Sequence, residues 1–467
     1  MKKFWSILGL CLILIVLLAP VALAEEAAPA APAINAGDTA FVIISAALVM
    51  LMTPGLAFFY GGMVRTKNVL SVIMQSFFIV ALISVQWVLW GYTLSFGTDI
   101  NGIIGGLNFL GLNGVGQTPM SDTSTIPHLV FMVFQGMFAV ITPALITGAF
   151  AERMKFPAFV IFTLIWATII YDPVAHWVWG GGWLATLGVL DFAGGTVVHI
   201  LSGVSGLVVA LVIGKRKGHG KEAMLPHHLP MTVLGASLLW FGWFGFNAGS
   251  ALAANGLAAS AFVTTNTAAA AACLSWVASE WLHHGKPTVL GAASGAVAGL
   301  VAITPAAGFV GPMSSVIIGL LAGVICYVAV GIIKAKLGYD DALDAFGVHG
   351  IGGTFGALAT GLFASKEINP AGNNGLFFGN PDLLTTQFIG VVVSWAVAIV
   401  GTYIILKVLG MFMKLRADND QEVSGLDITE HGERSYAQDF LAGSQMMAHS
   451  SLAQHSAVGT QVGLNLK

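Results

Sequence analysis

The sequence predicts an all-α polytopic membrane protein with eleven transmembrane helices. Of its 467 residues, 56% are hydrophobic and only 9% are charged, whereas about 25% of residues are charged in an ordinary soluble domain. Glycine is abundant, with 58 residues, and small residues allow membrane helices to pack closely. The net charge of -3, without long blocks of one sign, gives no indication of nucleic-acid binding. This composition excludes a soluble enzyme.

The chain begins with the features of a signal peptide. Two lysines precede an apolar run over residues 8–18, and a small-x-small cleavage pattern ends at Ala24. We therefore expect residues 1–24 to be a signal peptide and residues 25–37, which are rich in Ala and Pro, to be a periplasmic linker. A first helix that is retained is the alternative, and it also leaves the linker outside.

Apolar stretches long enough to cross a membrane recur along the rest of the chain. About 20 apolar residues are needed to span a hydrocarbon core of about 30 Å. The predicted spans lie near residues 38–63, 69–96, 127–150, 157–177, 187–213, 230–252, 258–281, 288–308, 313–335, 341–363 and 385–413. Together they form a transmembrane domain over residues 38–415, with repeat halves at about 38–213 and 230–363 and a final helix at 385–413.

Basic residues gather at alternate ends of these spans and predict the orientation. Of the 19 Lys and Arg residues, two lie in the leader and most of the others just past alternate spans. The positive-inside rule then places the mature amino terminus outside and the carboxyl terminus in the cytoplasm. Residues 416–467 become a cytoplasmic tail, whose first half is polar enough for interactions and whose remainder has a composition typical of disorder.

Two segments of the chain match each other and predict an inverted repeat. Asp191 is followed by His199, and Asp341 by His349, with seven residues between the members of each pair. The glycines that follow the two histidines match as well. Because the fifth and tenth spans cross the membrane in opposite directions, spans one to five are expected to be an inverted copy of spans six to ten, with the eleventh span added.

This repeat is expected to bring the two histidines together. If each helix begins near its aspartate, each histidine lies about 12 Å into the membrane, measured from opposite faces of a core about 30 Å thick. His199 and His349 are therefore predicted to lie within roughly 6 Å of each other in depth, near the midplane. One such histidine could simply bond a neighbouring helix, but a pair at one depth favours a line of polar groups along a pathway.

Other interpretations of these residues stay open. Imidazole also ligates haem and metals, although no third ligand is evident and the 3 cysteines are isolated in the sequence. Asp191 and Asp341 could be helix caps, and Asp191 could also shape the pore. Trp177 and Trp179 are typical of an interfacial aromatic belt. The loop that holds them has no basic residue, so an aromatic face is free to hold a cation.

Four segments carry a resemblance to a known family. They are Thr53–Gly62 (TPGLAFFYGG), Asp191–Gly206 (DFAGGTVVHILSGVSG), Gly242–Ser250 (GWFGFNAGS) and Phe346–Gly350 (FGVHG). With the repeat and the twin histidines, the chain resembles the Amt/Mep/Rh ammonium transporter family, and specifically a bacterial Amt protein, from about Asp38 to Tyr436. The resemblance implies a transporter or channel for ammonium and ammonia, not an enzyme, with no cofactor and no metal.

The resemblance also implies a role for individual residues. It assigns an outer ammonium site to Trp179, Ser250, Phe134 and Phe138, a gate to Phe138 and Phe246, a pore or proton relay to His199 and His349, and a site-shaping role to Asp191, Trp243 and Thr304. We expect ammonium to be held at the mouth, to lose its proton beneath the two Phe rings and to pass as ammonia, with or without transfer of the proton along the histidine pair. A charge at the bilayer centre costs at least about 2.5–3.5 kcal/mol, and potassium has no proton to lose.

Partners and location follow from the same resemblance. It implies a homotrimer with one pore per subunit in the membrane lipid of the bacterial inner membrane, serving nitrogen uptake, and a PII-type regulatory protein in the cytoplasm. The tail from Gly425 to Tyr436 resembles the inner tail of the family, and the chain beyond about Phe440 matches nothing. Two other functions stay open, namely an ammonium sensor that signals through the tail and a membrane haem protein.

Overall fold

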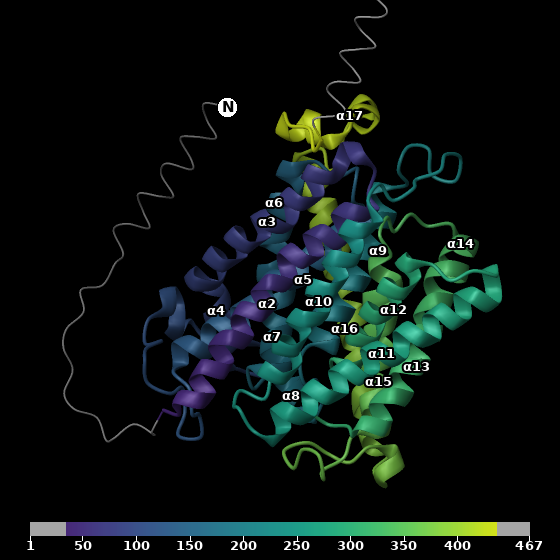
Figure 1. The fold of residues 1–467 in the computed structure, drawn as a ribbon. Helices are drawn as coiled ribbons and strands as arrows, with labels where there is room; N and C mark the ends of the chain where they lie inside the picture. The colour runs from purple at the N-terminus through teal and green to yellow at the C-terminus, as the bar shows by residue number, and fades with distance from the viewer. Residues whose placement is uncertain (1–33, 437–467) are drawn as a thin grey trace, which may run out of the picture.

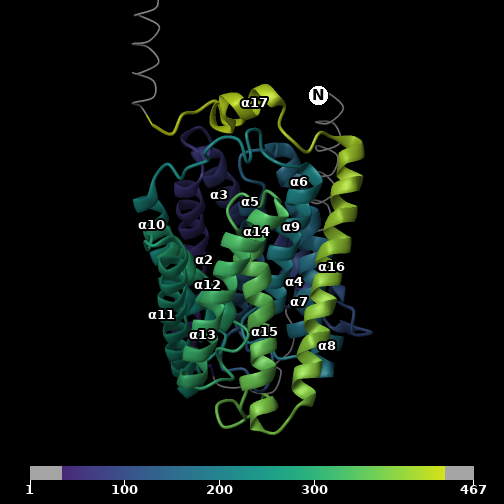
Figure 2. The same ribbon diagram turned by 90° about the vertical axis from the view of Figure 1, so that its right-hand side faces the viewer.

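The structure, a computed structural model, describes residues 34–436 and is a bundle of long helices that run roughly along one axis (Figures 1 and 2). Within these residues, nine helices are long and apolar enough to cross a membrane. They are α2 (Ala36–Met63), η1 to α4 (Thr66–Phe96), α5 (His128–Phe150), α6 to α8 (Phe156–Leu187), η5 and α9 (Gly195–Ile213), α10 (Leu229–Gly249), α11 (Gly256–His284), α13 to α14 (Pro312–Leu337) and α16 (Asp382–Phe412). The predicted polytopic helical membrane fold is confirmed.

Two further predicted spans are shorter helices inside the bundle. They are α12 (Val289–Ile303) and the continuous pair η7 (Phe346–Gly350) and α15 (Ile351–Phe363). The 15 residues of α12 reach about 22 Å at 1.5 Å per residue, which is less than the core of about 30 Å. Leu300 and Val301 of α12 are fully buried, and irregular backbone is tolerated at membrane depth where protein surrounds it. Each of the eleven predicted spans thus overlaps one helical stretch.

The two helices that carry the buried histidines begin later than predicted. They start at Gly195 and Phe346, and not at the preceding Asp191 and Asp341. Each aspartate instead caps its helix, because its carboxylate accepts hydrogen bonds from backbone amides at the helix start. The segments between aspartate and helix are apolar, so hydropathy could not separate them from the spans.

These two helices interlock through glycines. A Cβ atom added to Gly203 of α9 would lie 2.1 Å from the backbone nitrogen of Gly350, and one added to Gly353 of α15 would lie 3.0 Å from the carbonyl oxygen of Gly195. Each helix therefore presents a glycine to the amino-terminal half of the other. This reciprocal crossing involves Gly203 and Gly353, which occupy matching positions in the two sequence segments.

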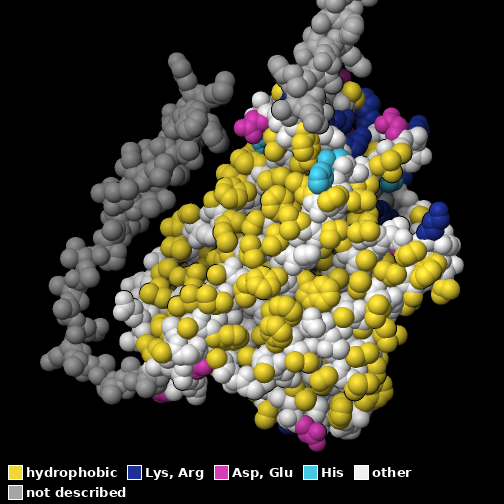
Figure 3. Space-filling view, viewed as in Figure 1, with side chains coloured by type: hydrophobic (Ala, Val, Ile, Leu, Met, Phe, Trp, Pro, Cys, Tyr) yellow, Lys and Arg dark blue, Asp and Glu magenta, His cyan; other side chains and the backbone are white. Residues whose placement is uncertain are grey.

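Lys and Arg residues gather at one end of the bundle, which we call the basic end (Figure 3). The short helices α17 (Asn419–Ser424) and η9 (Asp427–His431) lie across this end (Figures 1 and 2). The remaining short elements are β1 (Asp99–Ile100), β2 (Ile104–Gly105), η3 (Leu107–Leu112) and η8 (Leu376–Phe378). We call the end of the bundle away from α17 the opposite end.

The described part of the tail is bound to the bundle. The carboxylate of Asp427 accepts hydrogen bonds from the backbone amides of Leu70 and Ser71, at 3.0 and 2.8 Å. Lys67 Nζ donates to the carbonyl oxygens of Glu422 and Val423. The polar first half of the tail is therefore folded onto α3 (Val69–Gln86) and its neighbours.

Several predictions fall on residues that the structure does not describe. They are the signal peptide at 1–24, most of the linker at 25–37, and the tail beyond Tyr436.

Candidate functional site

The structure brings His199 and His349 together inside the bundle. Their Nδ1 atoms are 3.3 Å apart, and the two rings stack with centroids separated by 5.3 Å. Both residues are buried, with exposed fractions of 1% and 3%. One Nδ1 must carry a hydrogen and the other accept it. The pairing predicted from the repeat is present.

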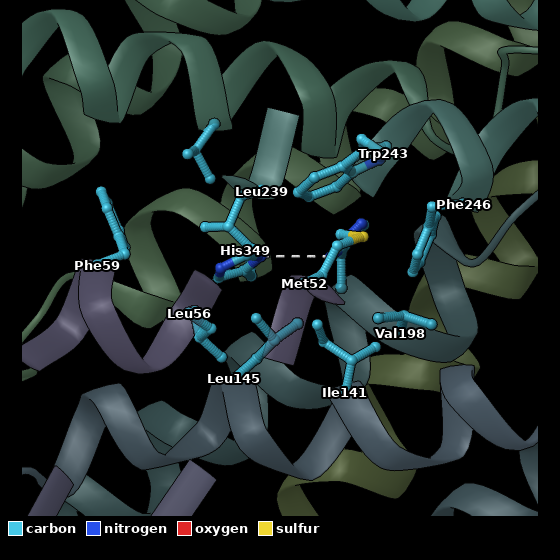
Figure 4. Close-up of a pocket in the computed structure, with 12 residues that line it drawn as sticks. Met52, Leu56, Phe59, Ile141, Leu145, Val198, Leu239, Trp243, Phe246 and His349 are labelled. Carbon is cyan, nitrogen blue, oxygen red and sulfur yellow. Dashed lines mark hydrogen bonds between the residues drawn. The ribbon is translucent and has the colours of Figure 1, made fainter. Parts of the chain in front are cut away.

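A narrow apolar cavity runs beside these histidines (Figure 4). Leu, Met, Ile and Val side chains make up most of its wall, together with the aromatic rings of Phe59, Trp243 and Phe246. Figure 4 shows His349 among these apolar side chains, and a hydrogen bond joins its Nδ1 to that of His199. Nε2 of His199 is buried and has no hydrogen-bond partner. The two imidazoles are therefore polar groups in an otherwise mostly apolar cavity wall.

Phe138 and Phe246 separate this cavity from the opposite end of the bundle. Their ring centroids are 4.4 Å apart and the rings are tilted by 38°. Both are about 1% exposed. Phe246 lines the cavity at the histidines, and its ring lies 6.1 Å from that of His199. Phe138 instead lines a second pocket on the other side. The pair is thus a closed partition between two spaces.

The second pocket is an aromatic vestibule at the opposite end. Phe138, Trp179 and Ser250 line it, and the centroids of Phe138 and Trp179 are 5.8 Å apart. Ser250 Oγ donates its hydrogen to the carbonyl oxygen of Phe246 at 2.8 Å, which leaves its lone pairs free to accept. Phe134 is fully buried behind Phe138, with ring centroids 5.0 Å apart, and does not line the vestibule.

Asp191 connects the vestibule to the helix that carries His199. Its carboxylate accepts hydrogen bonds from the backbone amides of Gly194, Gly195 and Thr196, at 2.7, 2.6 and 2.7 Å. Its carbonyl oxygen accepts a hydrogen bond from the indole nitrogen of Trp179 at 2.9 Å. The side chain is therefore a helix cap, and the residue as a whole fixes the position of Trp179.

Trp243 and Thr304 support the histidine pair from one side. The ring of Trp243 stacks on His199 with centroids 5.4 Å apart, and its indole nitrogen donates to Thr304 Oγ1 at 2.9 Å. The hydroxyl of Thr304 in turn donates a hydrogen bond to the carbonyl oxygen of Leu300. This chain of hydrogen bonds satisfies the indole N–H inside an apolar region.

The sequence reasoning did not identify two polar residues on the path. Gln135 lines the vestibule with Trp179 and Ser250. Asp344 lines a further pocket that also contains His349 and lies toward the basic end. Gln135 is a polar residue one position after Phe134 in an apolar span, and Asp344 lies five residues before His349. The polarity of these two positions is the feature of the sequence that could have identified them.

The site does not suit haem or a metal centre. The two imidazoles face each other directly through their Nδ1 atoms, which leaves no gap for an iron between them. Across residues 34–436, no group of three His, Cys, Asp or Glu side chains could hold a metal ion. The arrangement is instead that of a passage with an aromatic mouth, a closed partition and a polar constriction.

Comparison with known proteins gives a consistent result. The model of the Ammonium Transporter Family matches residues 40–436. An ammonium transporter of Bacillus subtilis is 57% identical over 400 residues, covering 86% of this chain and 98% of that protein. The ammonium transporter Amt1 of Archaeoglobus fulgidus is 50% identical, with coverage of 86% and 99%.

Solved structures are similar over most of the fold. The crystal structure of Saccharomyces cerevisiae Mep2 has a TM-score of 0.78 and 38% sequence identity, covering 83% of this chain and 88% of that one. A protein described as a sensor Amt protein has a TM-score of 0.79 and 30% identity, with coverage of 85% and 98%.

Proposed function

The chain belongs to the ammonium transporter family, which is a family of transporters and channels and not of enzymes, and we propose that it admits ammonium at the aromatic vestibule and conducts it as ammonia past the histidine pair. One observation carries the proposal. A continuous series of rings leads from Trp179 through Phe138 and Phe246 to His199 and His349, with each neighbouring pair of centroids between 4.4 and 6.1 Å apart.

Recognition takes place at the mouth. An aromatic face attracts a cation through its negative electrostatic potential, and the lone pairs of Ser250 can accept a hydrogen bond from an ammonium N–H. Trp179 has its own N–H engaged with Asp191, so the indole offers its ring face. Phe134 contributes by packing behind Phe138.

Deprotonation follows from the chemistry of the passage. A charge at the bilayer centre costs at least about 2.5–3.5 kcal/mol, and the cavity beside the histidines has a mostly apolar wall. Ammonium resembles the lysine head group, whose pKa of about 10.4 falls by up to 3–5 units on full desolvation. Ammonium therefore gives up its proton at the Phe partition, either to water in the vestibule or to the relay formed by His199 and His349, and ammonia passes the two imidazoles. Potassium, which has no proton to lose, is excluded.

The surroundings of the protein form part of the proposal. The basic end faces the cytoplasm of a bacterium, by the positive-inside rule, and the opposite end receives ammonium from outside the inner membrane. The bundle exposes large apolar side chains on its flank, among them Phe77 and Val85, as contact with lipid or with two further copies in a trimer requires. A PII-type regulator would meet the basic end.

Recording of both the current and the internal pH in liposomes that contain the purified protein tests the proposal, because ammonia that crosses without its proton moves no net charge. We expect ammonium to produce a transport response and potassium to produce none. The double variant His199→Asp with His349→Glu places fixed charge in the passage and should admit potassium. An equal response of the wild type to ammonium and potassium would exclude the mechanism. If the double variant still excludes potassium, the two histidines do not determine the selectivity against potassium.

A sensor is the second candidate function. It is favoured by the likeness to a sensor Amt protein and by the contacts of Asp427 with the start of α3, which could pass a change in the bundle to the tail. Removal of residues 416–467 separates the two functions, and removal of residues 437–467 is the matched control. A sensor should lose its signalling output only in the longer deletion, whereas transport should survive both.

A further inference from the structure

A carboxyl group lies within the membrane-spanning region without a cation to balance it. Asp172, the first residue of α7 (Asp172–Trp179), has an exposed fraction of 0%. Its Oδ2 accepts a hydrogen bond from Gln86 Nε2 at 2.7 Å. Within residues 34–436, none of the ion pairs includes Asp172. A buried charge that lacks a partner is strongly unfavourable.

Two oxygen atoms at this pair lack a hydrogen-bond partner. They are Oδ1 of Asp172 and Oε1 of Gln86, and both are fully buried. An ionised carboxylate and an amide oxygen can only accept hydrogen bonds, so they cannot satisfy each other. A protonated carboxyl group gains one O–H donor. A single proton on Oδ1 could therefore be donated to Oε1 and would satisfy both atoms.

We propose that Asp172 is a proton-binding site outside the conducting passage, where the protonated carboxyl forms a cyclic acid–amide pair with Gln86. Two hydrogen bonds join the planar groups: the amide N–H donates to Oδ2, and the acid O–H donates to Oε1. The pair carries no charge. An uncharged pair is the form that an apolar environment accepts.

A bound metal ion fits this place less well. Hard cations take six or more oxygen ligands, whereas the orphaned oxygens here number two. No group of three His, Cys, Asp or Glu side chains in the described part of the chain could hold a metal. A water molecule between the oxygens would satisfy them, but it would leave the carboxylate with an unbalanced charge.

Local backbone structure points to the same pair. Gln86 immediately precedes the wide turn η2 (Trp87–Gly91), and Asp172 immediately follows the wide turn η4 (Ala167–Tyr171). Such π-type turns within α-helices are frequent at functional sites. Gly91 makes room for the amide, because a Cβ there would lie 2.6 Å from Gln86 Oε1. Two irregular turns and a glycine thus converge on one polar contact.

The pair of Asp172 and Gln86 also affects the vestibule, and this part of the inference rests on the function proposed above. The helix α7 has only 8 residues and ends at Trp179. It is held at its start by the pair with Gln86 and in its middle by His176, whose ring nitrogens contact Asp99 and the carbonyl oxygen of Ser95. Asp172 is therefore a positioning residue for Trp179.

Infrared difference spectroscopy on the purified full-length protein tests the proton directly. The spectrum of the wild type minus that of Asp172→Asn should contain the C=O stretch of a protonated carboxyl group, and this band should shift in D2O. The exposed Asp382, at the start of α16, provides the control Asp382→Asn, which should leave the band in place. A difference spectrum that contains only carboxylate bands would overturn the proposal, because Asp172 would then be charged.

A second variant covers the case in which Asp172→Asn does not fold. Gln86→Leu removes the amide but keeps the acid, so the C=O band should persist and move to higher frequency. Ammonium should then half-saturate transport at a concentration about threefold to tenfold higher, the equivalent of one buried hydrogen bond, with the maximal rate little changed. If the C=O band has the same frequency in Gln86→Leu as in the wild type, Asp172 does not donate a hydrogen bond to Gln86, and the proposed pair is wrong. The infrared result does not depend on transport, so failure of the proposed function would leave it standing.

Discussion

The indole nitrogen of Trp179 donates a hydrogen bond to the backbone carbonyl of Asp191, at 2.9 Å. The same Asp191 caps the helix that carries His199 through its carboxylate. One residue thus sets both the ring that faces the vestibule and the start of the helix that reaches the constriction. The mouth and the middle of the passage are mechanically connected at this point.

The variant Asp191→Ala should lose transport and stability together. It leaves the amides of Gly194, Gly195 and Thr196 without their acceptor, and each buried unsatisfied group costs about 1–3 kcal/mol. We expect a melting temperature lowered by several degrees and no ammonium response in liposomes. The control Asp382→Ala, at an exposed helix start, should change neither. Wild-type transport in Asp191→Ala would contradict the role of the cap.

The variant Phe138→Ala should open the partition. It removes a ring that packs 4.4 Å from Phe246 and is 1% exposed, and such a truncation costs about 3–5 kcal/mol of stability. Currents in liposomes should then show a potassium component that the wild type lacks. Phe388→Ala, at a side chain that is 56% exposed, is the matched control. Unchanged exclusion of potassium in Phe138→Ala would show that the rings do not form the barrier.

The variant Gly203→Ala should disturb the crossing of the two repeat helices. The new Cβ would lie 2.1 Å from the backbone nitrogen of Gly350, and backbone cannot move aside as a flexible side chain can. Overpacking of this kind costs about 1–3 kcal/mol, and the histidine pair should separate. The control Gly116→Ala has open space around its new atom. Equal melting temperatures for the two variants would argue against a tight crossing.

The ion pair between Asp340 and Arg216 should make stability depend on pH. Burial alone would raise the pKa of Asp340, but the hydrogen bonds and charge of Arg216 outweigh it and hold this pKa well below its usual range. A carboxylate with a lowered pKa stabilises the folded state above its unfolded value of about 3.9, and this contribution is lost as the pH falls through the folded value.

The variant Asp340→Asn should therefore melt below the wild type at neutral pH, by the equivalent of about 3–5 kcal/mol. The difference should narrow as the pH falls below about 4, where the wild type begins to lose the same contribution. Asp418→Asn, at an exposed pair with Lys414, is the control. A gap that stays constant across this range would contradict the assignment.

The variant Asp427→Ala should release the tail. Its carboxylate holds the amides of Leu70 and Ser71, and hydrogen bonds to a charged group contribute about 1.5–3 kcal/mol each. Protease cleavage near Gly425 should be at least about tenfold faster when it follows the population of the open form. Glu433→Ala, on the exposed side of the tail, should leave cleavage unchanged. Equal cleavage in both variants would place the main anchor elsewhere.

The sequence predicted the histidine pair well for a physical reason. The helix starts were placed too early, but by four residues at Gly195 and five at Phe346, counted from the aspartates. Because the two helices run in opposite directions, nearly equal errors displace His199 and His349 by similar amounts on either side of the midplane, so their equivalent positions in the repeat are kept although the calculated separation in depth is not. Repetition therefore supplied a constraint that the soft helix boundaries alone could not.

Hydrophobic pattern and residue spacing could not predict other parts of the site. Phe138 and Phe246 are two of 29 Phe residues, and only family resemblance distinguished them. Gln86 and Asp172 lie in different apolar spans, and no periodicity connects them before the helices pack. The attachment of the tail to α3 depends on backbone amides, which every residue except proline has, so sequence could not indicate where Asp427 binds.

The contact between Gly203 and Gly350 limits how this molecule can move. Many repeat-built carriers expose their substrate alternately to each side by rocking one half against the other. Here the two repeat halves are in backbone contact at Gly203 and Gly350, near the histidine pair. A rocking motion of one half against the other would have to break this backbone contact. The proposed passage of ammonia is therefore expected to need rotation of the Phe138 and Phe246 side chains and no movement of one half of the bundle against the other.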